Sequence, residues 1–238
     1  MKKQSGATLI VVLVMLVLIT LVGTWALKSS ILTLKISTNS QVRSLLLENS
    51  NSALFNIEDP KQIARHLALD GMFSYFNGVQ NADDELVFCY RPSSMSTFYS
   101  MDKASVITKD GSTQKMGVTG FCKKGEFSSG RSAIQAQVYL RKNVEVGSPF
   151  SSAPIGTSLG GSEVPVVSNN IGATVISILP SFAGSSVSDA DIEKCFKKTA
   201  IKKDKDTETV EECFQALNIP YNLQHADYIV GGSPKLKS

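Results

Sequence analysis

The sequence predicts an α+β protein in which a long N-terminal helix packs on an antiparallel β-sheet and a disulfide-closed lobe follows at the C-terminus. Three observations lead to this prediction. Residues 7–27 form one uncharged apolar block. Short β-prone runs with two-residue alternation occur between residues 85 and 141. Residues 181–238 combine two capped helical patterns with a pair of cysteines.

The N-terminus has the pattern of a membrane anchor. A basic head, residues 1–6 with Lys2 and Lys3, is followed by Ala7 to Leu27, which contains no charge. As an α-helix this block is roughly 31 Å long, the thickness of a bilayer core. The two lysines favour the cytoplasmic side for the head, so the rest of the chain is expected outside.

The start of the apolar block resembles the leader of the type IV pilin superfamily. It reads Gly6-Ala7-Thr8-Leu9-Ile10-Val11. Members of that superfamily have a short basic leader that ends in glycine, and most continue with an aromatic residue and then Thr-Leu-Ile-Glu. Ala7 and Val11 replace the aromatic residue and the glutamate. Over about residues 1–55 the chain is similar to the PilX minor pilins and to their counterparts, the GspK pseudopilins of type II secretion.

This resemblance implies a function in pilus assembly. Prepilin peptidase would cleave after Gly6, and the new terminal amine of Ala7 would be methylated. Val11 cannot supply the carboxylate that balances a neighbouring subunit's buried terminus, so a priming subunit at or near the fibre tip is implied. Expected partners are the inner membrane, prepilin peptidase, other minor pilins and the major pilin. No cofactor, metal, nucleic acid or enzymatic activity is expected.

Five parts are predicted along the chain. They are a leader at 1–6, a transmembrane segment at 7–27, an amphipathic continuation of the helix at 28–55, an α+β periplasmic head at 56–180, and a helical, disulfide-stapled lobe at 181–238. Before assembly, the resemblance implies a single-pass inner-membrane protein with a periplasmic C-terminal domain; afterwards it implies the pilus tip or cell surface. A flexible linker after the anchor is the alternative, because Ser37–Ser40 and Asn49–Ser52 are weak helix formers.

Other interpretations of function stay open. A secretory signal peptide is one alternative. Thr24-Trp25-Ala26 would be its cleavage site, but this site is poor and the apolar run before it is longer than signal peptides have. A plain anchor without processing at Gly6 is a further alternative. Within the same machinery the runner-up is a GspK-like pseudopilin. Two alternatives belong to other functional classes. One is an adhesive module, for which the Ser/Gly/Pro-rich loop Phe150–Gly172 would be the binding region, and the other is a membrane-tethered enzyme.

The head is expected to begin with a helix and continue with strands. Asp59-Pro60 predicts a helix that runs to about Phe76, with Gly71 kinking or ending it and His66 at the surface or its boundary. Strands are predicted at 86–90, 105–108, 116–121, 133–141 and 173–179, with a hairpin turn at Asp110-Gly111. In 133–141 the alternation predicts one buried and one wet face, with Gln135, Gln137, Tyr139 and Arg141 on the wet face.

Four cysteines lie on the expected periplasmic side, where disulfides persist. Three pairings are possible. Sequential pairing, Cys89 with Cys122 and Cys195 with Cys213, is favoured because it closes short loops and matches the two regions in which the cysteines lie. The second pair would join helices at Ser188–Phe196 and Thr207–Leu217. A zinc site is the alternative, but the chain has no Cys-x-x-Cys pair and two histidines.

Composition and motifs exclude several functions. With 24 basic and 21 acidic residues, the net charge of +3 is too balanced to indicate nucleic-acid binding. Phosphate-binding loops, metalloprotease motifs and nucleophile elbows are absent from the sequence. The acidic clusters at 81–85 and 189–193 could ligate calcium, although neither has EF-hand spacing. The charged run 202–206 is expected to be a solvated turn.

Overall fold

The computed structural model describes residues 7–92, 98–117, 119–130, 133–143, 169–202 and 206–230. The chain divides into two units, residues 1–44 and 45–238. The leader 1–6 and residues 144–168, which hold most of the predicted Phe150–Gly172 loop, lie outside the described residues. The last residues of that predicted loop, 169–172, are strand rather than loop.

The N-terminal helix is continuous. Helix α1 is 52 residues long, from Ala7 to Glu58, which confirms the predicted long helix and makes the linker alternative wrong. Its sequence contains no proline and a single glycine, Gly23. The helix ends where Asp59 precedes Pro60, because the proline ring disfavours helical backbone in the residue before it.

The prediction of a helix from Asp59 to Phe76 is wrong, because only about one turn of this region is helical. Helix α2 covers only Ile63–His66, and 3₁₀ turns follow at Ser74–Asn77 and Val79–Asn81. At Gly71 the chain folds back on α2 so closely that a Cβ atom there would lie 2.3 Å from the carbonyl oxygen of His66. This reversal lets Met72, Phe73 and Phe76 fill the core.

Within the described residues, five strands form one antiparallel sheet in the order β2-β1-β3-β4-β5. Their bounds are Glu85–Cys89 for β1, Ala104–Ile107 for β2, Gln135–Lys142 for β3, Asn169–Ile178 for β4 and Tyr221–Val230 for β5. A 3₁₀ turn, Met101–Lys103, leads into β2. The sheet confirms the α+β class, but edge strand β5 was not expected, since its region was predicted to be helical lobe.

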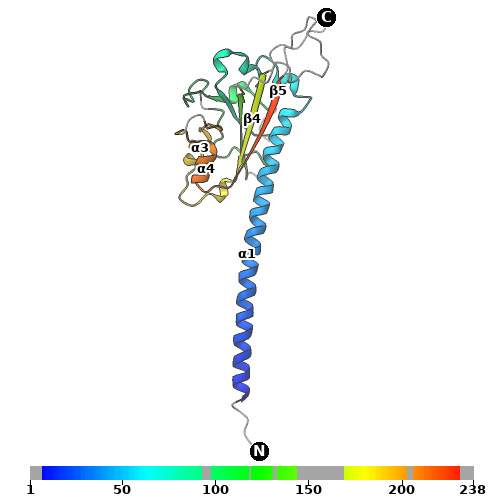
Figure 1. Ribbon diagram of the computed structural model, residues 1–238, viewed down its shortest axis with the longest axis vertical. Helices are drawn as coiled ribbons and strands as arrows, with labels where there is room; N and C mark the ends of the chain where they lie inside the picture. Colours follow the sequence, from blue (N-terminus) through cyan, green and yellow to red (C-terminus); the bar gives the residue numbers. More distant parts are fainter. Residues whose placement is uncertain are drawn as a thin grey trace, which may run out of the picture. The chain divides into compact units, whose positions relative to one another are not determined.

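Both faces of the sheet are covered. Figure 1 shows the sheet between the last turns of α1, in cyan, and the C-terminal helices, in orange. One apolar cluster joins Ala53 and Ile57 of α1 to inward residues such as Val138. The other joins Tyr139 to Phe196 and Phe214 of the C-terminal helices. The predicted wet face is therefore wrong: Gln135, Gln137 and Tyr139 are buried, and Arg141 is half-buried.

The Asp110-Gly111 turn forms, but the return strand predicted at 116–121 does not. Gly111 has φ +81°, and the amide of Thr108 donates to the carbonyl of Ser112 at 2.9 Å. Among the described residues of 113–122 the chain is irregular. It crosses the face of β2: the amide of Gly120 donates to Ser105 Oγ at 2.9 Å, and a Cβ on Gly120 would lie 2.3 Å from the nitrogen of Ser105.

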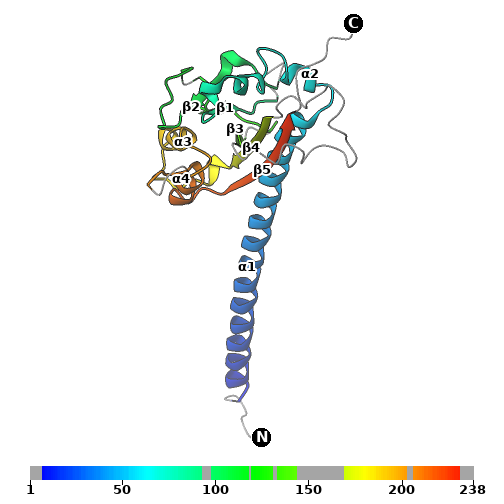
Figure 2. The ribbon, with the colours of Figure 1, turned by 45° about the horizontal axis from the view of Figure 1, so that its top comes forward.

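The C-terminal lobe contains two short capped helices after the 3₁₀ turn Pro180–Phe182. Helix α3 covers Asp189–Phe196 and helix α4 covers Val210–Ala216, and both lie together on one side of the sheet (Figure 2). Ser188 with Asp191, and Thr209 with Glu212, form reciprocal capping boxes. The predicted helices are confirmed, with the second shorter than expected. Lys202 pairs with Glu212 at 2.7 Å, and 203–205 of the charged run lie outside the described residues.

Candidate functional site: the exposed apolar helix and its attachment to the head

The first part of α1 presents apolar side chains in every direction. The large apolar side chains from Leu9 to Leu27 are 49–82% exposed. In the part of the chain that the structure describes, α1 is the helix long and apolar enough to cross a membrane. A helix that is apolar all round needs lipid or protein around it, because in water this surface would stay exposed at a high cost.

Two threonines within the apolar segment form hydrogen bonds with the backbone of the helix itself. The hydroxyl of Thr20 donates to the carbonyl of Val17, and that of Thr24 to the carbonyl of Leu21, both at 2.9 Å. Unpaired polar groups are costly in hydrocarbon, so these bonds fit the helix to lipid. Trp25 is 82% exposed near the end of the segment, where membrane helices commonly carry an aromatic side chain.

The sequence-predicted processing residues lie at the start of this helix. Ala7 is the first residue of α1, while Gly6 lies outside the described residues. Val11 is 57% exposed and carries no group that could balance a charge. The methylation of Ala7 and the cleavage after Gly6 remain predictions.

A polar seam attaches the last turns of α1 to the sheet. The buried hydroxyl of Ser50 donates to Ser177 Oγ of β4 at 2.8 Å. Ser52 Oγ and Asn56 Nδ2 each lie 3.0 Å from the phenolic oxygen of Tyr90. Leu46, Ala53 and Ile57 supply the apolar part of the same buried stripe. The stretch Asn49–Ser52, a weak helix former by composition, is therefore a hydrogen-bonding surface.

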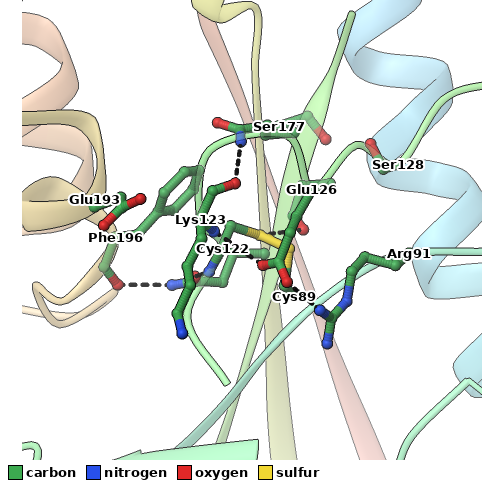
Figure 3. Close-up of a disulfide and its surroundings, with 12 residues drawn as sticks. Cys89, Arg91, Cys122, Lys123, Glu126, Ser128, Ser177, Glu193 and Phe196 are labelled. Carbon is green, nitrogen blue, oxygen red and sulfur yellow. Dashed lines mark hydrogen bonds and ion pairs between the residues drawn. A yellow bond between two sulfur atoms is a disulfide. The ribbon is translucent and has the colours of Figure 1, made fainter. Parts of the chain in front are cut away.

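The disulfides form with the favoured pairing. Cys89 joins Cys122, and Cys195 joins Cys213, with Cα atoms 4.8 and 5.5 Å apart. The described residues of 113–122, which cross the face of β2, are called the crossing segment below. Figure 3 shows the first disulfide where this segment meets the sheet, with Arg91 and Glu126 paired beside it. The amide of Cys122 also donates to Gln137 Oε1 at 2.9 Å. The first disulfide therefore fastens the crossing segment over β1 and β3.

A buried polar network holds the C-terminal lobe on the sheet. Gln137 Nε2 and the Tyr139 hydroxyl donate to the carbonyl of Phe196 at 2.7 and 2.9 Å. Burial raises the pKa of Tyr139 well above its usual value, and the nearby carboxylate of Glu85 adds to the shift. Tyr139 therefore stays a neutral donor. Nothing in the strand's alternation distinguishes these buried polar side chains from solvent-facing ones.

The acidic cluster at 81–85 serves the fold. Buried Glu85 accepts from the Thr199 hydroxyl at 2.6 Å and the Ala200 amide at 3.1 Å. Asp84 accepts from the Tyr75 hydroxyl at 2.6 Å, and Lys109 lies 3.2 Å from Asp83.

The cluster at 189–193 is divided among local contacts. Asp191 caps α3, Asp189 pairs with Lys124 at 2.6 Å, and Glu193 accepts from the Lys124 amide at 3.0 Å. Across the described ranges, His, Cys, Asp and Glu side chains form no group of three or more that could hold a metal ion.

A hydroxyl, an imidazole and a carboxylate lie in line on β4 and β5. Thr174 Oγ1 is 2.8 Å from His225 Nδ1, and His225 Nε2 is 3.3 Å from Asp227 Oδ1. Thr174 is 4% exposed in the middle of a strand. A substrate cannot approach its hydroxyl in this conformation, so these contacts serve to pair the strands.

Comparisons of the chain with protein-family models, with curated proteins and with solved structures find no match.

Proposed function

We propose that this protein is a minor pilin of the PilX type that primes assembly of a type IV pilus and occupies its tip or a position near it. One observation carries the proposal: a short basic leader ending in Gly6 precedes a charge-free, exposed apolar helix that continues without a break to Glu58. Such a helix can lie in lipid before assembly and pack among other helices in a fibre afterwards.

The attachment of the helix supports a subunit in which one element serves both membrane and head. Its last turns bury an apolar and polar stripe on the sheet, as the contacts of Ser50 and Ser52 show. The cluster of cysteines in two disulfides suits an oxidising compartment such as the periplasm. A GspK-like pseudopilin is less favoured, because outside α1 the described residues contain only short helices.

Cleavage by prepilin peptidase tests the proposal. The full chain produced with the peptidase is expected to lose the mass of residues 1–6, whereas the chain produced without it keeps them. Gly6→Val should stay uncut, since a peptidase working at the membrane surface needs an unhindered backbone there. Intact mass spectrometry gives the answer, and trimming of the Gly6→Val variant at the same bond would contradict the proposal.

The position in the fibre depends on Val11. Val11→Glu is expected to move labelled protein from fibre ends to sites along the shaft, because a carboxylate there can balance a neighbour's buried amine. Val12→Glu is the matched control, since its side chain points about 100° away around the helix. Labelling of fibres in electron micrographs measures the distribution. Wild-type protein spread evenly along shafts would count against a tip position.

A deletion strain separates assembly from adhesion. Loss of fibres indicates an assembly function. Normal fibres with lost binding to surfaces would favour the adhesive module instead.

A further inference from the structure

The charge of the chain is divided unevenly between the helix and the rest. Residues 1–47 contain Lys2, Lys3, Lys28, Lys35 and Arg43, and no aspartate or glutamate occurs before Glu48. Because the whole chain has a net charge of +3, the remainder from Glu48 onward is net −2. Three of the cations, Lys28, Lys35 and Arg43, lie on α1 beyond the apolar block, and we call the segment 28–47 the cationic segment.

The cations of this segment are exposed and have no ion-pair partner among the described residues. Lys28 and Lys35 are seven residues apart, so they lie about 20° from each other around the helix. Arg43 lies about 80° from Lys35 in the opposite direction, so all three cations fall within about 80° around the helix. All three therefore lie within roughly a quarter of the helix surface. Val42 and Leu46 on the same face are buried, so one partner helix can lie along Lys28 and Lys35 and meet Arg43 at its end.

Exposed apolar side chains accompany the cations. Ile31 is 54% exposed and Ile36 63%, and they lie about 60° and 80° to either side of Lys28 around the helix. Beyond the apolar block these side chains have no lipid core to enter. Apolar positions that alternate with charges along a helix are the pattern of a helix-docking surface, in which charges select the partner.

Lipid headgroups reach only part of this segment. If the hydrocarbon span ends at Leu27, Lys35 lies about 12 Å and Arg43 about 24 Å further along the axis. The headgroup layer on each side of a bilayer is about 5–8 Å thick. Anionic lipid can meet Lys28, but Arg43 lies well beyond it.

We infer that the cationic segment docks on a helix of a different subunit that carries carboxylates opposite Lys28, Lys35 and Arg43, and not on a second copy of this chain. Parallel copies side by side in register would place like charges together, with no carboxylate on either helix before Glu48. This deepens the proposed function and rests on it, because it states which kind of subunit the assembling helix meets.

A charge-reversed copy of the chain serves as the acidic partner. The probe is the full chain carrying K28E, K35E and R43E, mixed with the wild-type chain in zwitterionic detergent at low ionic strength. A photo-reactive amino acid at exposed Asn39, which lies within about 40° of all three cations around the helix, reports pairing as crosslinked dimer. Wild type with the reversed chain is expected to give at least about tenfold more crosslink than wild type with itself, since three opposite-charge pairs replace three like-charge pairs.

Two controls make the outcome specific. A chain carrying K61E, K103E and K123E has the same net-charge change on exposed lysines outside α1, and it should not crosslink more than wild type does with itself. A chain carrying K28Q, K35Q and R43Q should give intermediate crosslinking and shows whether the segment tolerates substitution. High salt should remove the difference between the pairings.

The inference is overturned if wild type crosslinks with itself as strongly as with the reversed chain, or if neither pairing crosslinks. It is also overturned if the chain carrying K61E, K103E and K123E crosslinks with wild type as strongly as the chain carrying K28E, K35E and R43E does. Equal pairing together with binding of wild type to phosphatidylglycerol vesicles, but not to phosphatidylcholine vesicles, would overturn it in favour of lipid. The peptidase assay is independent of these mixtures. Loss of cleavage with selective pairing would therefore reject the pilin function alone.

Discussion

Replacing Cys89 and Cys122 together with alanine is expected to lower the free energy of unfolding by about 3–4 kcal/mol, the effect of opening a loop between cysteines 33 residues apart. The loss comes largely from the greater freedom of the unfolded chain. In the folded chain this disulfide fastens the crossing segment over the sheet, where Cys122 also donates to Gln137. Urea unfolding of the full chain in detergent micelles, followed by tyrosine fluorescence, measures the change.

Replacing Cys195 and Cys213 with alanine is the matched control for this disulfide. Its cysteines are 18 residues apart, so the expected loss is smaller, about 3 kcal/mol. Opening the first disulfide should also increase hydrogen exchange at Gly120 and Phe121, whereas opening the second should increase it in α3 and α4. A loss below about 1 kcal/mol for the first pair would mean that packing of buried Phe121 holds the crossing segment by itself.

The two-residue period of β3 predicts which side chains share a face, but not what covers that face. Gln137 and Tyr139 look like solvent-facing residues because they are polar or amphipathic. They are buried because the carbonyl of Phe196, at the end of a helix 59 and 57 residues later in the chain, accepts their hydrogen bonds. A contact of this separation leaves no local signal in the strand.

The same reason explains what was missed in α1 and at Asp110-Gly111. Ser50 reads as a weak helix former, but its partner Ser177 lies 127 residues away. The turn at Gly111 is local, so its residues predict it correctly. The segment after the turn crosses β2 because Gly120 contacts Ser105 and Cys122 bonds to Cys89, and neither contact is encoded near the turn.

The sequence of β5 has the two-residue alternation of a strand, but the capped helical patterns before it led to the prediction of a helical lobe. Tyr221 and Leu223 alternate with Asn222 and Gln224, and the register places Leu223 opposite Ile176. By contrast, the candidate membrane helix depends on composition alone. The block from Ala7 to Leu27 contains no charge, and the structure shows it as helix with exposed apolar side chains, so composition predicts its exposure correctly.

Acidification below about pH 6.5, the ordinary pKa of histidine, is expected to destabilise the head through His66. The sequence predicted this residue at the surface or its boundary, but it is 1% exposed, with Nε2 3.2 Å from the carbonyl oxygen of Asn56 and Nδ1 without a partner. Its ring meets Phe73 and Phe98 edge-on, with centroids 6.0 and 5.8 Å away. The imidazole therefore joins the end of α1 to the segment that follows it.

Burial lowers the pKa of His66, and the charge of Arg65 lowers it further, while the Asn56 carbonyl and Asp59 act in the opposite direction. Above pH 6.5 the folded and unfolded chains both hold neutral histidine, so this stability is complete. As the pH falls from 6.5 towards the lowered folded-state pKa, only the unfolded chain binds the proton. Each pH unit within that window costs about 1.4 kcal/mol.

His66→Phe should remove this pH dependence while keeping the aromatic contacts. His225→Asn is the matched control, because the chain has only these two histidines and the side chain of His225 is 40% exposed. Urea unfolding of the full chain at pH 7.5, 6.5, 5.5 and 4.5 should show a steeper loss for wild type and His225→Asn than for His66→Phe. If His66→Phe lost stability as steeply as wild type, titration of carboxylates would be the cause and His66 would have no part in it.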